Sequence, residues 1–109
     1  MGKSNVQTRK PTKKQKMLAD AVKKLDGNFE LVVIDYELCL YKRRADGKFD
    51  VEVSGTIGYL RYCNIYLWRR SGGWRLIKTV YKVNKDPEVI VNLVNELLDN
   101  ADEIFASQQ

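Results

Sequence analysis

Aromatic and basic side chains are concentrated in one stretch of the chain, residues 59–81. Six of the eleven aromatic residues lie there, interleaved with five Arg or Lys side chains. Bases of single-stranded nucleic acid stack on aromatic rings for about 1 to 3 kcal/mol each, while nearby cations neutralise the phosphates. The pattern therefore predicts a nucleic-acid-binding surface. Its candidate residues are Arg61, Tyr62, Tyr66, Trp68, Arg69, Arg70, Arg75, Lys78 and Lys82, with Lys10, Lys13 and Lys14 added from the N-terminal part of the chain.

Charges of opposite sign are segregated along the sequence. Residues 1–16 carry six basic side chains and no acid, residues 53–85 carry seven and no acid, and residues 86–109 carry six acids and no base. An ordinary surface intersperses the two signs, although a plain solvated surface is the alternative interpretation of these cations. We expect the two basic zones to meet an anionic partner, which is DNA, RNA or a ribonucleoprotein.

Catalytic and metal-binding chemistry has little support in the residue types. The chain has no histidine, which removes Ser-His-Asp and Cys-His catalysis and most zinc sites. Cys39 and Cys63 have no Cys-x-x-Cys partner, so they are interpreted as reduced thiols within strands. Asp35 and Glu37 could share a metal, but two carboxylates without a third ligand more often serve cross-strand pairing. We expect a protein that is not an enzyme and has no catalytic residue, metal or cofactor.

The N-terminal part of the chain divides into an arm and a helix. Residues 1–11 are polar and without an apolar period, so we expect a disordered basic arm. Thr12 can cap a helix over residues 13–25 that stops before Gly27. The apolar stripe predicted for this helix consists of Leu18, Ala21, Val22 and Leu25.

Residues 12–109 are expected to form a single domain, because 109 residues leave no room for a second core. The longest apolar run, Leu31 to Ile34, is far shorter than the ~20 residues that cross a bilayer. The basic N-terminus also lacks the apolar region of a secretory signal. We therefore expect no membrane partner and a cytoplasmic location.

Strands are predicted by alternation and by turn chemistry. Residues 30–43 alternate with a period of two, which indicates one long strand. Asp46-Gly47 is typical of a type I′ hairpin turn, and this turn pairs Leu40 with Val53 and Arg43 with Asp50. Turns at residues 55–58 and 71–73 bound further strands over residues 60–70 and 74–84.

A C-terminal helix completes the predicted fold. Asp86-Pro87 provides an N-cap and a proline at the first helical position, and an apolar stripe follows from Ile90 to Phe105. The predicted class is α+β, with the order helix, four-stranded antiparallel meander, C-terminal helix. Both helices cover one face of the sheet, and the other face stays open to water or to a partner.

The loop Ser71-Gly72-Gly73 admits two registers, and the sequence leaves both open. With all three residues in the loop, Arg70 pairs with Trp74, and Tyr62, Tyr66 and Trp68 lie on the open face. With Gly72-Gly73 alone as the turn, Ser71 pairs with Trp74, and the same three aromatic side chains enter the core. Both registers place Tyr81 in the core and leave the exposed side of this hairpin basic, so phosphate binding is expected in either case.

Several segments of the first half of the chain resemble a known family. They are Gly2-Lys3-Ser4 at the start of a basic arm, Leu25-Asp26-Gly27 at the end of the helix, and the strand from Gly47 to Ser54. In these features the chain resembles small anti-CRISPR proteins of streptococcal phages, which inhibit type II-A Cas9. The resemblance covers about half of the chain, and residues 59–84 do not match the family's pattern. It implies a phage protein in the host-cell cytoplasm whose target is a complex such as Cas9 with its guide RNA.

A second function is weighed beside nucleic-acid binding. The open sheet face, with Tyr62, Tyr66 and Trp68, could instead form a protein-interaction surface or a homodimer interface. In that case the acidic C-terminal helix would meet a basic surface. The orientation of the three aromatic side chains distinguishes the base-stacking hypothesis from burial in the core.

Overall fold

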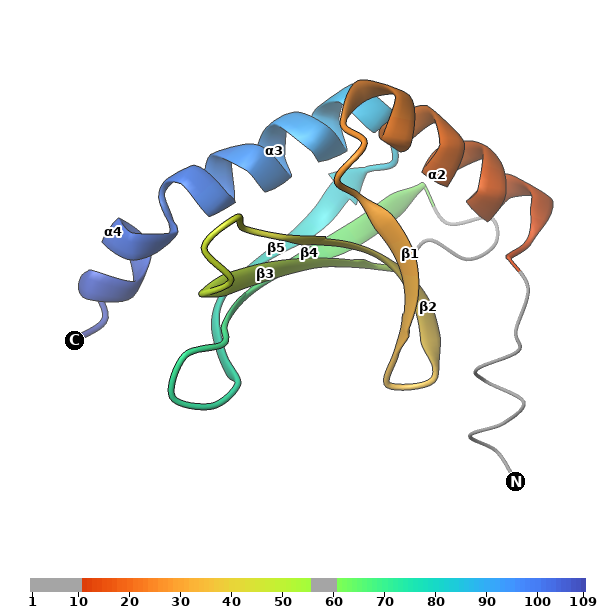
Figure 1. Cartoon of the computed structure of the whole chain (residues 1–109). Helices are drawn as coiled ribbons and strands as arrows, with labels where there is room; N and C mark the ends of the chain where they lie inside the picture. Colours follow the sequence, from red (N-terminus) through yellow and green to blue (C-terminus); the bar gives the residue numbers. More distant parts are fainter. Residues whose placement is uncertain (1–10, 56–60) are drawn as a thin grey trace.

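The computed structural model describes residues 11–55 and 61–109 and shows an α+β fold. Five antiparallel strands form one sheet in the order β1-β2-β3-β4-β5, and α2 and α3 pack on one face of it (Figure 1). The elements are α2 (Lys13–Leu25), β1 (Glu30–Ile34), β2 (Glu37–Arg43), β3 (Phe49–Ser54), β4 (Tyr62–Arg69), β5 (Arg75–Asn84), α3 (Pro87–Asp99) and α4 (Ala101–Ala106). The face that α2 and α3 cover is called the inner face below, and the opposite face is called the outer face. The predicted arm, apart from Pro11, and most of the predicted turn at 55–58 lie outside the described residues.

Local capping explains where α2 begins. Thr12 Oγ1 accepts a hydrogen bond from the Gln15 amide at 3.1 Å, and Gln15 Oε1 accepts one from the Thr12 amide at 2.9 Å. This capping box satisfies amide groups that the helix itself leaves unpaired. The predicted helix over 13–25 and its Thr12 cap are confirmed, although Leu25 is half exposed and Ala19 takes a buried position instead.

The prediction of one long strand over residues 30–43 is wrong, because these residues form a hairpin of two strands, β1 and β2. The chain reverses at Asp35 and Tyr36, which both have positive φ, 48° and 67°. Val32 then pairs with Cys39, and the sheet gains a fifth strand. A two-residue turn keeps the period of two in both arms, so alternation alone does not reveal the reversal.

The next hairpin has the predicted register but not the predicted turn type. Leu40 pairs with Val53 and Arg43 with Asp50, as expected. A type I′ turn needs positive φ at both Asp46 and Gly47, but of the two only Gly47 has it, at 73°, and the Gly47 amide donates to the Arg44 carbonyl at 2.8 Å. This register places the apolar side chains of β3 on the inner face, under the helices.

The β4–β5 hairpin combines both predicted registers, because two irregularities interrupt it. Near the turn Trp68 pairs with Leu76, as the three-residue loop requires, but Leu67 pairs with Lys78, one residue further along β5. A second shift lies between Cys63 and Ile65. The β-bulges absorb one residue each and keep the core side chains of both strands aligned.

The face of each β4 side chain follows from this pairing. Cys63, Ile65 and Leu67 are buried on the inner face, so Tyr62, Tyr66 and Trp68 lie on the outer face by alternation. The prediction for Tyr81 is wrong. The second bulge gives the inner position to Val80, which packs against the core, and leaves Tyr81 69% exposed.

The core fills the space between the inner face and the helices. Phe49, Val51 and Ile65 from the sheet and Ile90 and Val94 from α3 are fully buried. The predicted start of α3 is confirmed, since Asp86 accepts hydrogen bonds from the Glu88 and Val89 amides ahead of the first turn. The predicted single helix is interrupted at Asn100, after which α4 continues.

Within residues 11–55 and 61–109, none of the helices has both the length and the apolar character needed to cross a bilayer.

Candidate binding surfaces

The predicted cations of the β4–β5 hairpin do not share one face. Arg69 and Arg75 are paired across the strands and lie against α4, with the Arg69 guanidinium 4.0 Å and the Arg75 guanidinium 5.9 Å from the centre of the Phe105 ring. Both are therefore on the helix side of the molecule. The expectation that the outer face of this hairpin is basic is not met at these two positions.

Arg70 lies on the other side and already has protein partners. Its Nε is 3.5 Å from Asp50 Oδ2, its Nη1 donates to the Gly47 carbonyl at 3.2 Å, and its guanidinium lies 5.3 Å from the Trp74 ring centre. These contacts connect the two hairpin loops. Arg70 is consequently a positioning residue of the outer face, with less freedom to meet a phosphate than a solvated side chain has.

Several of the other candidate cations belong to the end of the sheet where β4 begins and β5 ends. The Lys85 amide donates to the Arg61 carbonyl at 3.1 Å, and Lys82 occupies the second bulge. Burial lowers the pKa of Lys85, and the positive charge of Lys14 in the first turn of α2 acts in the same direction. The basic end, as it is called below, consists of Lys13, Lys14, Arg61, Lys82 and Lys85. Lys85 is an addition to the predicted set, and Lys10 lies outside the described residues.

Lys78 is exposed on β5, where it pairs with Leu67. Lys78 lies nearer the middle of β5, whereas Lys82 and Lys85 lie at or just beyond its C-terminal end. The sequence therefore grouped cations that the bulged hairpin distributes over three places: the basic end, the α4 side and the outer face.

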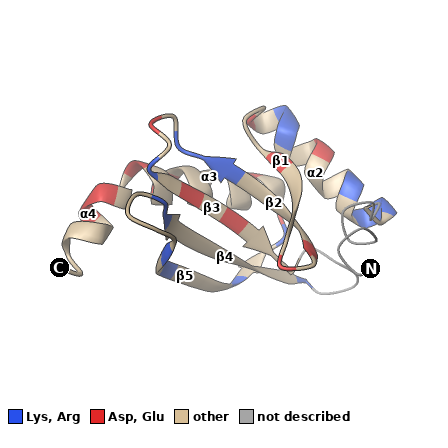
Figure 2. Cartoon of the chain, turned by 60° about the horizontal axis from the view of Figure 1, so that its bottom comes forward, with Lys and Arg blue, Asp and Glu red and all other residues tan. Residues whose placement is uncertain are grey.

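Acidic side chains occupy the middle of the outer face. Figure 2 shows the positions of acidic residues in red along the ribbon of β3, whose outward residues are Asp50, Glu52 and Ser54. Glu37 on β2 accepts hydrogen bonds from Ser54 Oγ at 3.2 Å and from the Gly55 amide at 2.6 Å. A polyanion laid across this face would meet like charge at its centre, which separates the predicted aromatic platform from the predicted phosphate contacts.

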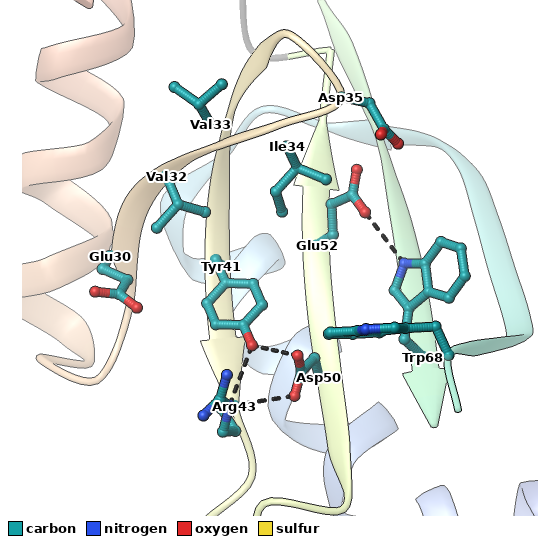
Figure 3. Close-up of a pocket in the computed structure, with 11 residues that line it drawn as sticks. Glu30, Val32, Val33, Ile34, Asp35, Tyr41, Arg43, Asp50, Glu52 and Trp68 are labelled. Atoms are coloured by element: carbon teal, nitrogen blue, oxygen red, sulfur yellow. Dashed lines mark hydrogen bonds and ion pairs between the residues drawn. The ribbon is translucent and has the colours of Figure 1, made fainter. Parts of the chain in front are cut away.

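Glu52 is a half-buried carboxylate beside the indole of Trp68. Its Oε1 accepts a hydrogen bond from Trp68 Nε1 at 3.1 Å (Figure 3). Burial raises the pKa of Glu52, and the negative charges of Asp35 and Glu37 raise it further, against the lowering effect of the Trp68 hydrogen bond. Trp68, predicted to stack on a base, therefore has its polar edge committed to an acid.

Asp50 is completely buried although its side chain is a carboxyl group. Tyr41 donates its hydroxyl hydrogen bond to Asp50 Oδ2, and Arg43 Nε is 3.5 Å from Oδ1 (Figure 3). Arg70 Nε is 3.5 Å from Oδ2. Burial raises the pKa of Tyr41, and its hydrogen bond to Asp50 acts in the same direction. Within the described part of the chain, Asp50 Oδ1 receives no hydrogen bond.

These groups line a pocket of about 610 Å³ on the outer face. Side chains of β1 form one side of it, and Trp68 lies on the opposite side beyond Tyr41, Asp50 and Glu52 (Figure 3). Trp74 completes the aromatic part, with its ring centre 6.3 Å from that of Trp68 and the two planes at 83°. The lining residues are Glu30, Val32, Val33, Ile34, Asp35, Tyr41, Arg43, Asp50, Glu52, Trp68 and Trp74.

The sequence prediction missed this pocket because it missed a turn. The pairing of Arg43 with Asp50 and the outward direction of Glu52 follow from the Asp46-Gly47 hairpin and could be predicted. The wall made by β1 depends on the reversal at Asp35 and Tyr36, which has no glycine to signal it. The sequence singles out Trp68 as a candidate but does not reveal its hydrogen bond to Glu52.

Cys39 and Cys63 are both free and buried, as the absence of a Cys-x-x-Cys pattern predicts. Burial raises the pKa of Cys39 to about 12, with the charges of Glu37 and Glu52 adding to the effect, and burial raises that of Cys63 to about 11. Neither thiol has the low pKa of a nucleophile. Among residues 11–55 and 61–109, no three Cys, Asp or Glu side chains are grouped in a way that could hold a metal ion.

Comparison with protein-family models, with curated proteins and with solved structures finds no match to this chain.

Proposed function

We propose that this chain is a non-enzymatic binding protein whose basic end holds a nucleic acid or the nucleic-acid part of a nucleoprotein. The observation that carries the proposal is the convergence of two acid-free segments far apart in sequence. Lys13 and Lys14 come from the first turn of α2, and Arg61, Lys82 and Lys85 come from the end of the β4–β5 hairpin. Like charges gathered at one place repel one another, and a polyanion relieves that repulsion.

The acids of the outer face support this location over the middle of the sheet. Asp50 and Glu52 lie where a base-stacking surface would run, and Trp68 donates to Glu52. Phosphate contacts at the basic end are therefore favoured over stacking on the sheet. The resemblance to anti-CRISPR proteins adds a Cas9 complex with its guide RNA as one nucleoprotein to test.

Fluorescence anisotropy with labelled RNA and DNA strands, single and double, tests the proposal at salt concentrations from about 50 to 200 mM. The double variant R61A/K82A should weaken binding and lower the slope of log affinity against log salt by about 1.4 to 1.8, because two phosphate contacts are lost. The matched control K48A/R75A also removes two exposed cations, but from the opposite end of the hairpins, and should leave the slope unchanged.

Two results would overturn the proposal. One is the absence of binding to every nucleic acid and to the Cas9 complex with its guide RNA. The other is an equal loss of affinity in R61A/K82A and K48A/R75A, since binding would then follow net charge and not the basic end. Far-UV circular dichroism of each variant provides the check that the fold is retained.

A protein-interaction module is the second candidate function. It is favoured by the large apolar side chains exposed on β5 and its loop, among them Trp74 at 62% and Tyr81 at 69%. Sedimentation at several protein concentrations tests its homodimer form, in which the average mass should rise with concentration. A mass that stays at one chain's value would contradict a homodimer and leave a different protein as the partner.

A further inference from the structure

The outer-face pocket has both acidic and aromatic side chains in its lining, and no group of residues 11–55 and 61–109 fills it. Four acids and one base line it, Glu30, Asp35, Asp50 and Glu52 against Arg43, which gives a net charge of 4 − 1, or three negative charges. Counting Arg70, which reaches Asp50 from outside the lining, still leaves two. The space of about 610 Å³ is large enough for one long side chain and part of its backbone.

The negative charge at the Glu52 side of the pocket is not neutralised. No ion pair with Asp35, Glu37 or Glu52 is present within residues 11–55 and 61–109. The charges that act on Glu52 are those of Asp35 and Glu37, which repel it. Asp50 adds a buried oxygen, Oδ1, that is 3.5 Å from Arg43 Nε and receives no hydrogen bond from the described residues. A cation entering the pocket would gain attraction that the folded chain alone does not provide.

The aromatic walls specify an organic cation. Trp68 and Trp74 stand nearly perpendicular, and Tyr41 lies across the pocket floor from them. The faces of such rings attract cations, most strongly where water is displaced. The chain uses this contact twice at the rim, with the Arg43 guanidinium 5.9 Å from the Tyr41 ring centre and the Arg70 guanidinium 5.3 Å from that of Trp74.

We propose that this pocket binds an arginine side chain of a partner protein, with the guanidinium against the face of the Trp68 ring and beside Glu52, whose hydrogen bond from Trp68 Nε1 is kept. A planar guanidinium can stack on a ring and donate two parallel hydrogen bonds to a carboxylate, which an ammonium group cannot do. The surroundings fit a protein chain, because β5 also exposes the large apolar side chains of Leu76, which pairs with Trp68, and Tyr81. Trp, Tyr and Arg are also the side chains that contribute most at protein interfaces. The site is independent of the basic end.

The two tryptophans of the chain both line the pocket, so all indole fluorescence reports on it. The probe is the capped tripeptide Ala-Arg-Ala, titrated into the full chain up to about 10 mM, a range that detects the weak affinity of one side chain. We expect a saturable change in emission that weakens with salt. The peptide with citrulline in place of arginine has the same shape without the charge and should give no saturable change.

Variants separate the pocket from general charge effects. E52Q keeps an oxygen that can accept from Trp68 and should weaken arginine-peptide binding about tenfold, because one charge-assisted hydrogen bond pair is lost. E96Q removes an acid from the exposed side of α3 and should change nothing. W74L changes an exposed side chain that contacts Trp68 and Arg70 and should weaken binding as well. It therefore keeps the test decisive if E52Q does not fold.

Three results would overturn the assignment. They are a flat titration with the arginine peptide, equal binding of the citrulline peptide or of the capped tripeptide Ala-Lys-Ala, and equal affinity of E52Q and E96Q. R61A/K82A should bind the arginine peptide as the unchanged protein does, and E52Q should retain any nucleic-acid binding. A failure at one surface is therefore distinguishable from a failure at the other.

Discussion

Lys42 is a largely buried lysine on the inner face, and a buried charge is costly without a counter-charge. Its contacts therefore give a sharp test of the fold. It pairs with the buried Val51, and its Nζ donates to Asp26 Oδ2 and to Asn95 Oδ1, both at 2.5 Å. The side chains of Lys42 and Asp26 are only 14% and 12% exposed. Asp26 ends α2 and Asn95 belongs to α3, so this polar group connects both helices to β2.

Removing the two charges one at a time should have unequal effects. In D26A, Lys42 keeps Asn95 as an acceptor but loses its counter-charge, and the Asn28 amide loses its acceptor at 3.0 Å. Breaking one partner of a buried ion pair costs about 3 to 5 kcal/mol, and the residual exposure points to the lower end, about 3 kcal/mol. In K42M, Asp26 keeps donors from Asn95 and Asn28, so we expect about 1 to 2 kcal/mol.

The double variant D26A/K42M leaves no buried charge and should lose about 2 kcal/mol less than the sum of the single losses. Urea unfolding at pH 7, followed by circular dichroism and indole fluorescence, measures the free energy of unfolding for all four proteins. D20A is the matched control. Asp20 is an exposed acid of the same helix whose pair with Lys16, at 3.9 Å, is a surface contact worth less than about 1 kcal/mol.

Single losses that add within about 0.5 kcal/mol, or a D26A loss no larger than that of D20A, would refute this reasoning. The pH dependence gives an independent check. Burial opposes ionisation of Asp26, but hydrogen bonds from Lys42, Asn28 and Asn95 outweigh it, so the pKa of Asp26 lies below its ordinary value. Its contribution to stability is therefore complete above the unfolded-state pKa of about 3.9 and is lost as pH falls through the folded-state pKa. D26A should lack that acid loss.

Three further predictions concern a turn, the thiols and a cap. Y36G should raise the free energy of unfolding by about 0.5 to 1 kcal/mol in urea titrations, because Tyr36 is exposed with a φ of 67° that glycine adopts without strain; a loss of stability would contradict the turn. Cys39 and Cys63, with their pKa raised to about 12 and about 11, should react slowly with a disulfide reagent in the folded protein at about pH 8 and rapidly in urea; fast labelling of the folded chain would show that they are not buried. D86A should cost about 1 kcal/mol by removing the acceptor of the Glu88 and Val89 amides, while D86N, which can still cap, should cost little; equal losses in thermal unfolding would exclude capping.

The parts of the fold that the sequence predicts are those decided within a few residues. Thr12 with Gln15, Asp86 with Pro87 and Asp46-Gly47 each fix a helix start or a turn by local hydrogen bonds and backbone preference. These signals are readable because the competing conformations are few. They are also why the pairing of Leu40 with Val53 could be predicted residue by residue.

The errors occur where local preference is overridden. Asp35 and Tyr36 adopt positive φ without glycine, and the packing of β1 and β2 against neighbouring elements supports that conformation. Because of the two bulges, neither predicted register holds along the whole β4–β5 hairpin. The bulges also leave Tyr81 exposed to solvent, where the prediction placed it in the core. Bulges respond to the fit of the whole sheet on the helices, which no short window of sequence contains.

The two proposed surfaces together limit the kind of partner that fits. A nucleic acid alone would occupy the basic end and leave the acidic pocket on β3 facing solvent, because phosphates are repelled by Asp50 and Glu52. A protein alone would satisfy the pocket and leave Lys14 and Lys85 close to each other. A nucleoprotein supplies both complements, phosphates for the basic end and an arginine for the pocket. If both titrations succeed, a partner containing both should therefore bind more tightly than either component, and E52Q and R61A/K82A should each remove only part of that affinity.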